Sequence, residues 1–283
     1  MSAISYVNGS YIDHDEANVN IEDRGYQFAD GVYEVFAVIN KKIVDYDGHL
    51  NRLFRSLKEI SLKSPIANDA YLFHIRNLIR KNNIKDGLIY LQISRGVAQR
   101  DFKFPKNTKP SLVITAKNIS MGTYDAKFNK GIKVKITEDL RWKRVDIKTL
   151  NLLPPVLAKQ KAVESGCDEA WMIDSEGYIT EGSSSNAWIL NKDKLITTPI
   201  GNSILKGITR TSLIKALKRE NVKLEEKRFN ERDIKNADEA FITSATQFVM
   251  PVIKVDNIKI GSGKVGKYAH IFRKAYMEAI QLK

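Results

Sequence analysis

Short stretches of hydrophobic, β-prone residues are separated by polar residues and glycines in the first part of the chain. In residues 4–12 such residues lie on both sides of Asn8-Gly9, a dipeptide typical of a two-residue hairpin turn. A second hairpin is predicted over residues 34–46, and strands are predicted over residues 88–94 and 111–116. We therefore expect strands to form much of this part.

Two other stretches of the same part have the spacing of helices. Leucines and Phe54 recur at helical intervals over residues 49–57, after Asp47, which stands where an N-cap residue would. A second helix is expected after Asn68, over residues 71–80. Together with the strands, these helices predict a small N-terminal α/β domain over residues 1–118.

Residues 119–123 are predicted to be an interdomain linker, because they are largely polar, contain Gly122 and show no period. A larger C-terminal α/β domain is expected over residues 124–283. Its predicted elements are strands at 132–137, 169–173, 187–190 and 239–244, and helices at 154–165, 210–219 and after Lys264. A length of 283 residues agrees with two compact domains rather than one.

The composition narrows the class of protein. The apolar runs are short and interrupted by charge, and the N-terminus lacks the pattern of an export signal, so we expect a soluble protein without a membrane segment. The single cysteine, Cys167, cannot form an intrachain disulfide, which fits a reducing cytoplasm. Neither cysteine nor histidine occurs in a pair with metal-ligand spacing, so no metal is expected.

A formal net charge of +13 raises the question of a nucleic acid partner. The lysines are scattered along the chain, however, and no basic stripe is interleaved with aromatic residues. We interpret the charge as a solvated, lysine-rich surface, which would also suit small anionic substrates. No nucleic acid partner is expected.

Lys148 is the first candidate for chemistry, because it precedes an apolar run and is followed by two glycine-containing segments. A lysine amine in apolar surroundings loses solvation, and its neutral form can attack an aldehyde to form a Schiff base. That is the chemistry of pyridoxal phosphate enzymes. Taken alone, such a lysine is more often a surface residue with a packed stem, so the interpretation depends on its companions.

The two glycine-containing segments supply those companions. Glu181 precedes three serines and an asparagine, a small polar cluster suited to lining a cofactor ring. A carboxylate beside a pyridine nitrogen keeps that nitrogen protonated, so that the ring can accept electrons. Gly207-Ile208-Thr209 opens a predicted helix, where backbone N–H groups bind phosphate. An ordinary turn and a plain N-cap are the alternatives for these two segments.

With these segments in place, the chain resembles the class IV (fold type IV) pyridoxal phosphate-dependent aminotransferases, most closely the D-amino acid transaminases. The matching strings are residues 22–34, 49–53, 141–142, 146–160, 181–186, 205–210 and 243–244. The resemblance covers nearly the whole chain. It implies an α/β fold of the α+β type, two domains with the active site at their interface, pyridoxal 5'-phosphate as cofactor, and a homodimer.

The resemblance also implies roles for individual residues. Lys148 would form the Schiff base and move the proton between the substrate α-carbon and the cofactor, and Glu181 would pair with the pyridinium nitrogen. Leu205 would pack against the cofactor ring. The remaining cofactor-binding residues would be Arg52, Ser184, Gly207, Ile208, Thr209, Ser244 and Ala245, most of them at the phosphate. The family has threonine where this chain has Ala245, so only a backbone N–H could serve there.

Three further residues are implied to bind the substrate. Tyr33 would lie near the substrate carboxylate and the cofactor phenolate. Arg100 matches the arginine with which D-amino acid enzymes grip the carboxylate, on a loop that reaches into the neighbouring subunit. Those enzymes place a histidine where this chain has Phe102, so one charge-assisted contact is missing, worth about 1.5–3 kcal/mol unless replaced.

The implied reaction takes a D-amino acid such as D-alanine and 2-oxoglutarate to a 2-oxo acid and D-glutamate, by a ping-pong cycle through pyridoxamine phosphate. Branched-chain aminotransferases of the class typically carry tyrosine where this chain has Leu152, which favours the D-amino acid reaction. Two alternatives within the class stay open, a branched-chain L-amino acid aminotransferase and an aminodeoxychorismate lyase. An alternative of a different kind is a non-catalytic, cationic nucleic-acid-binding protein with the same fold.

Overall fold

The computed structural model describes residues 3–219 and 222–281, and the chain divides into two compact units. Unit 1 consists of Met1–Ser120 and Ile147–Asn151, and unit 2 of Met121–Asp146 and Leu152–Lys283. The expected linker was wrong in part, because helix α4 (Met121–Lys130) begins inside it. The expected domain bounds also need correction, because Ile147–Asn151 belongs to unit 1, where Ile147 is buried in the hydrophobic core.

The described part of unit 1 forms a six-stranded antiparallel sheet. In sheet order the strands are β2 (Ser10–Asp13), β1 (Ile4–Val7), β6 (Ser111–Asn118), β5 (Gly87–Ser94), β3 (Gly31–Ile39) and β4 (Lys42–Ile43). The helical segments are η1 (His14–Glu16), α1 (Arg24–Phe28), α2 (Tyr46–Glu59) and α3 (Asn68–Lys81). The predicted hairpin turn is present, with positive φ angles of 48° at Asn8 and 106° at Gly9.

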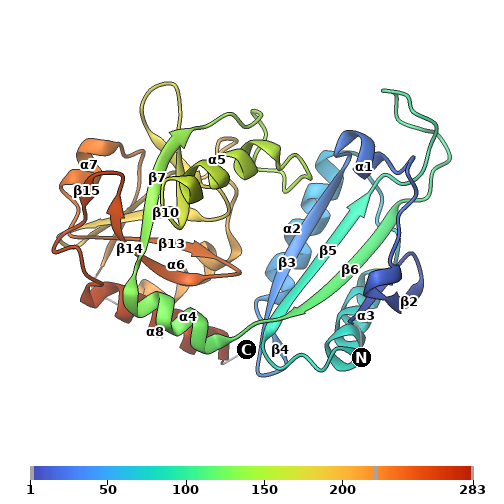
Figure 1. Ribbon diagram of the computed structural model, residues 1–283, viewed down its shortest axis with the longest axis horizontal. Coiled ribbons are helices and arrows are strands. Elements are labelled where there is room, and N and C mark those ends of the chain that lie inside the picture. The colour runs from blue at the N-terminus through green and yellow to red at the C-terminus, as the bar shows by residue number, and fades with distance from the viewer. Residues whose placement is uncertain (1–2, 220–221, 282–283) are drawn as a thin grey trace. The chain divides into compact units, whose positions relative to one another are not determined.

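Helices α2 and α3 cover one face of this sheet (Figure 1). Alternate residues of the central strands, among them Val32, Phe36 and Ile89, point into a single core with apolar residues of the two helices. The residues between them, such as Tyr33 and Tyr90, therefore lie on the opposite face of the sheet. This alternation decides which side chains of β3 reach the core and which lie on the other face.

The described part of unit 2 is built on a nine-stranded mixed sheet, in which β7 runs parallel to β14 and β8 and β11 runs parallel to β12. Its strands are β7 (Ile132–Glu138), β8 (Glu169–Ile173), β9 (Ile179–Gly182), β10 (Asn186–Asn191), β11 (Lys194–Thr197), β12 (Lys223–Glu226), β13 (Glu239–Ser244), β14 (Phe248–Val255) and β15 (Ile258–Lys259). Besides α4, the helical segments are α5 (Leu153–Glu164), α6 (Ile208–Ala216), η2 (Leu217–Arg219), α7 (Glu231–Lys235) and α8 (Lys267–Gln281). Helix α5 packs on β7 and β8, and α8 packs on β13, β14 and α6 (Figure 1).

Most of the predicted elements are present, whereas several others were missed. The missed elements are η1 and α1 in unit 1 and α4, α7, β9, β11, β12, β14 and β15 in unit 2. Strand β14 was not predicted because its first five residues are all buried and include Pro251. Its sequence therefore shows neither alternating hydrophobic and polar residues nor an ordinary strand composition. No helix in the described ranges is both long enough and apolar enough to cross a membrane.

Candidate active site

Lys148 lies on a short segment that pairs with the beginning of β3 in unit 1. The Tyr33 N–H donates to the Lys148 carbonyl oxygen at 3.1 Å, and Val32 and Thr149 form an antiparallel bridge. On the other side, the Lys148 N–H donates to the Ser56 hydroxyl of α2 at 3.3 Å. With Ile147 anchored in the core, the backbone at Lys148 is fixed by strand, helix and core together.

The Lys148 side chain meets one of the residues predicted to act with it. Its amine nitrogen lies 4.0 Å from the centroid of the Tyr33 ring. The Tyr33 ring in turn contacts Tyr90, with 5.6 Å between ring centroids, and the Tyr90 hydroxyl donates to Gln92 at 2.8 Å. Burial, with a smaller effect of the Tyr33 phenol, raises the pKa of Tyr90 to about 12. Two tyrosines and the lysine thus gather in one place in unit 1.

Arg52, predicted to bind phosphate, is held by a carboxylate that the sequence did not single out. Its Nε and Nη2 atoms donate to the two oxygens of Glu34 at 2.6 and 2.8 Å. Glu34 is fully buried and also accepts from His49 Nδ1 at 2.8 Å. Burial would raise the pKa of Glu34, but the charge and hydrogen bonds of Arg52, with His49, lower it to about 2. Burial, only partly opposed by Glu34, lowers the pKa of His49, which therefore donates as a neutral imidazole.

Arg100 and Phe102 lie on an exposed loop of unit 1. The Arg100 guanidinium stacks on the Phe28 ring at 4.5 Å, and Phe28 and Phe102 have ring centroids 5.5 Å apart. Arg24 lies over the same Phe28 ring and donates to the Asp101 carbonyl oxygen. Arg100 and Phe102 thus share contacts with the Phe28 ring, whereas Tyr33 packs beside Lys148 and Tyr90.

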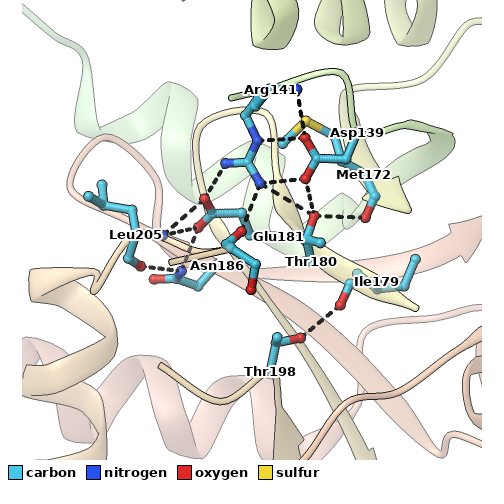
Figure 2. Close-up of polar contacts among 10 residues, drawn as sticks. Asp139, Arg141, Met172, Ile179, Thr180, Glu181, Asn186, Thr198 and Leu205 are labelled. Atoms are coloured by element: carbon cyan, nitrogen blue, oxygen red, sulfur yellow. Dashed lines mark hydrogen bonds and ion pairs between the residues drawn. The ribbon is translucent and has the colours of Figure 1, made fainter. Parts of the chain in front are cut away.

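Glu181 is the centre of a buried network in unit 2 (Figure 2). It stands on β9, and its carboxylate accepts from Arg141 Nη1, from Asn186 Nδ2 at 2.9 Å and from the Leu205 N–H at 3.1 Å. The Leu205 carbonyl oxygen accepts a second bond from Asn186 at 2.9 Å. The structure thus brings two predicted residues, Glu181 and Leu205, into direct contact through a backbone hydrogen bond.

Arg141 divides its guanidinium between two carboxylates, as Figure 2 shows. Its Nε and Nη2 atoms donate to the two oxygens of Asp139 at 2.9 and 2.7 Å, whereas a single nitrogen reaches Glu181. Thr180 adds a hydroxyl donor to Asp139 at 2.7 Å. Burial raises the pKa of Glu181 and Arg141 opposes this only in part, whereas in Asp139 the hydrogen bonds and charge of Arg141 outweigh burial and lower the pKa. Glu181 is therefore the less compensated of the two carboxylates.

The predicted phosphate segment forms the N-terminus of α6, with Gly207 as its N-cap. Gly207 has no side chain with which to cap the helix, and the first N–H groups of a helix, which have no partner within it, are suited to binding an anion. A Cβ atom at position 207 would lie 2.0 Å from Asn186 Oδ1, so only glycine fits. Asn186 is opposite Thr243 in the sheet register, which brings the end of β13 near the same place.

The remaining predicted residues lie on two turns of unit 2. Ser244 ends β13, and its hydroxyl pairs with the Thr246 hydroxyl at 3.2 Å and accepts from the Gln247 N–H at 3.1 Å; Ala245 lies in the same turn. The Ser184 hydroxyl donates at 3.3 Å to Glu169, a fully buried carboxylate that also accepts from Ser183 and Ser185. In this structure the Ser184 hydroxyl is thus directed toward Glu169.

Sequence reasoning missed the residues that hold the predicted ones. They are Glu34 and His49 in unit 1 and Asp139, Arg141, Glu169 and Asn186 in unit 2. Arg141, Asn186, Glu34 and His49 stand inside the matching strings without an assigned role, which was the available signal. Among the described residues, no group of three or more His, Cys, Asp or Glu side chains could hold a metal ion.

Comparison with known protein families gives a direct match. Residues 31–255 match the family model described as "Amino-transferase class IV". A D-alanine aminotransferase of Staphylococcus haemolyticus is 38% identical over 277 residues, which are 98% of this chain and 97% of that protein. A D-alanine aminotransferase of Bacillus licheniformis is 38% identical over 259 residues, 92% of this chain and 90% of that protein.

Solved structures show the same fold. A branched-chain amino acid aminotransferase of Escherichia coli superposes with a TM-score of 0.92 and 23% identity, covering 99% of this chain and 95% of that one. The T.th. branched-chain amino acid aminotransferase with pyridoxamine 5'-phosphate has a TM-score of 0.93 and 23% identity, covering 100% of this chain and 96% of that one. At this identity the likeness concerns the fold.

Proposed function

Because the chain belongs to the class IV aminotransferases, we propose that it transfers the amino group of a D-amino acid, D-alanine or one similar to it, to a 2-oxo acid such as 2-oxoglutarate. The observation that carries the proposal is the likeness to D-alanine aminotransferases at 38% identity over 98% of the chain. The branched-chain relatives among the solved structures share the fold at 23% identity and so weigh less on the choice of substrate.

Enzymes of this class use pyridoxal 5'-phosphate, and two features of the structure fit that cofactor. Burial raises the pKa of Glu181, and the single Arg141 nitrogen that reaches its carboxylate offsets this only in part, so a protonated pyridine nitrogen would add a second positive partner. The N-terminus of α6 has no described side-chain cap and a glycine that cannot be replaced without a clash, as suits a phosphate group. When bound, the cofactor supplies a ring that withdraws electrons from the substrate α-carbon.

We assign the roles accordingly. Lys148 would attach the cofactor and carry the proton at the substrate α-carbon, and the Tyr33 ring beside its amine would limit where that amine can move. Glu181 would bind the pyridine nitrogen, and Leu205 would lie against the ring. The residues proposed for the phosphate are Arg52, Gly207, Ile208, Thr209, Ser244 and the backbone of Ala245.

The proposal includes a homodimer in which the Arg100 loop serves the neighbouring subunit. Its support is a group of large apolar side chains in unit 1 that are exposed in the single chain. Phe102 is 85% exposed, Ile21 79% and Tyr26 76%, and contiguous exposed apolar surface marks sites of protein–protein interaction. Burial against a second copy would remove this apolar surface from water.

Phe102 bears on which substrates the enzyme takes. The Arg100 guanidinium is held over the Phe28 ring, so it can meet a carboxylate without a second cationic partner. Phe102 adds an apolar ring beside Phe28 where the D-amino acid enzymes have a histidine. We propose that the substrate carboxylate depends on Arg100 alone in this loop, and that affinity for short, polar substrates is reduced.

Covalent trapping tests the proposal. Borohydride reduction of the enzyme with bound cofactor, followed by peptide mass analysis, should place the cofactor on Lys148. Lys148→Ala should show no such adduct and no turnover of D-alanine, whereas Lys143→Ala, which alters an exposed lysine of the same region, should keep both. Turnover by Lys148→Ala at the rate of the unaltered enzyme would contradict the proposal.

A further inference from the structure

Glu34 is a buried carboxylate that the proposed reaction does not use. It lies on β3 with no exposed surface, on the side of the strand that faces the core of unit 1. Burying a charge in such a place is unfavourable unless it is paired and hydrogen-bonded, and an apolar residue would often serve stability as well. Its presence next to a residue predicted to bind the cofactor suggests that it does more than fill space.

The partners of Glu34 come from one face of α2. His49, Arg52 and Ser56 are spaced at i, i+3 and i+7, so they lie along one side of the helix. His49 and Arg52 donate to Glu34, and Ser56 accepts from the backbone of Lys148. This face of α2 therefore meets both the Glu34 carboxylate and the segment that carries the proposed catalytic lysine.

The contact between Glu34 and Arg52 fixes an orientation. Two parallel N–H···O bonds, at 2.6 and 2.8 Å, hold the guanidinium plane in line with the carboxylate. An arginine side chain otherwise samples many rotamers, and ordering it when a ligand binds lowers the affinity. His49, donating at 2.8 Å, fixes the carboxylate in turn.

We propose that Glu34 is a positioning residue, which orders Arg52 so that its guanidinium meets the cofactor phosphate, with His49 holding Glu34 in place. The inference rests on the proposed function, because it takes Arg52 as a phosphate ligand. The inference predicts that phosphate affinity falls when Glu34 loses its charge, whereas electrostatics alone predicts the opposite. As a negative group beside Arg52, Glu34 weakens the attraction of phosphate, so removing its charge would tighten binding if charge alone mattered.

The test compares two ligands that differ by the phosphate. Binding of pyridoxal 5'-phosphate and of pyridoxal to the full-length protein is followed by the absorbance of the bound chromophore, for the unaltered protein and for Glu34→Gln. Glutamine keeps the volume but presents an NH₂ group to one Arg52 nitrogen, so one of the two parallel hydrogen bonds is lost. We expect affinity for pyridoxal 5'-phosphate to fall about 10- to 100-fold and that for pyridoxal to stay within about twofold.

Matched variants keep the test decisive. Glu59→Gln makes the same change at the end of α2, in a pair with Arg55 at 3.8 Å, and should alter neither affinity. If Glu34→Gln is not folded by circular dichroism, His49→Leu, which removes only the bond that orients Glu34, takes its place with a smaller loss of the same selectivity. In either variant, equal losses for both ligands, or an unchanged or tighter affinity for pyridoxal 5'-phosphate, would overturn the inference.

The unaltered protein separates the two levels of the proposal. If it binds pyridoxal 5'-phosphate and the cofactor is trapped on Lys148, the proposed cofactor site stands, and the ratio between variant and unaltered protein then judges Glu34 alone. If the unaltered protein binds neither ligand, the proposed function fails, and the role of Glu34 fails with it.

Discussion

Glu34 in unit 1 and Glu181 in unit 2 are both buried carboxylates beside an arginine, yet their pKa values move in opposite directions. The pKa of Glu34 is lowered to about 2, despite complete burial. That of Glu181 is raised above its ordinary value of 4.5. An ion pair with arginine therefore does not by itself decide whether a buried carboxylate is satisfied.

The difference follows from how each guanidinium is shared. Arg52 gives two parallel bonds to Glu34, and His49 adds a third. Arg141 gives its two parallel bonds to Asp139 and a single nitrogen to Glu181, whose other donors are neutral amides. The charge of Glu34 is fully compensated by protein groups, whereas one more positive partner would still stabilise the charged form of Glu181. The first suits positioning and the second suits binding a cofactor nitrogen.

Replacing Glu181 should have the largest effect on activity. Glu181→Gln removes the carboxylate charge that is proposed to keep the pyridine nitrogen protonated. We therefore expect kcat to fall by about 100-fold or more, with the cofactor still attached to Lys148. Steady-state assay with D-alanine measures the rate, and the absorbance of the bound cofactor shows its presence. Glu176→Gln, at an exposed position of unit 2, is the control. Full activity of Glu181→Gln would mean that the network of Figure 2 does not serve the reaction.

Replacing Glu34 should have the larger effect on stability. Glu34→Gln should lower the free energy of unfolding of the cofactor-free protein by about 3 kcal/mol, because it breaks a buried ion pair. Glu181→Gln should cost about 1 kcal/mol or less, since Arg141 keeps Asp139 as its partner. Urea unfolding of both variants measures the difference. Equal losses would abolish the contrast between the two carboxylates.

Lowering the pH should change the contributions of Glu34 and Glu181 to stability in opposite directions. The lowered pKa of Glu34 contributes stability that is present above the ordinary value of 4.5 and is lost as the pH falls toward about 2. The advantage of the unaltered protein over Glu34→Gln should therefore shrink in that window. The raised pKa of Glu181 is a cost at neutral pH that disappears as the pH falls through the raised value, so the unaltered protein should gain on Glu181→Gln. Urea midpoints at a series of pH values would show whether the two curves diverge.

The smallest effect is expected at Asp139. Asp139→Asn removes the carboxylate that takes most of Arg141, which allows Arg141 to compensate Glu181 more fully. A better compensated Glu181 should bind the pyridine nitrogen less strongly, and we expect kcat to fall about three- to tenfold. The same steady-state assay tests this. An increase in kcat would show that Asp139 competes with the cofactor rather than supporting it.

Local pattern was enough to predict much of the fold. The Asn8-Gly9 turn, α2 and α3 follow from turn chemistry and helical spacing, which act between near neighbours. The same rules could not place Ile147–Asn151 in unit 1, because its pairing with β3 joins residues more than a hundred positions apart. A local pattern carries no record of such a contact.

The candidate site was predictable only in part for a similar reason. Lys148, Glu181 and Gly207 stand in recognisable strings, and their proposed roles stay predictions. The groups that hold the neighbouring side chains were not found, since Glu34 meets Arg52 across 18 positions and Arg141 meets Glu181 across 40. Which guanidinium is shared and which is not depends on three-dimensional packing, and this decides the properties of the two carboxylates.

The most direct test of the account is a single-turnover reaction of the enzyme with bound cofactor, mixed with D-alanine and, in parallel, with L-leucine. We predict that D-alanine converts the bound chromophore to the pyridoxamine form, with loss of its visible absorbance, and that L-leucine does not. That result would also show that Arg100 serves without the histidine that Phe102 replaces. Conversion by L-leucine alone would contradict the account and identify a branched-chain aminotransferase.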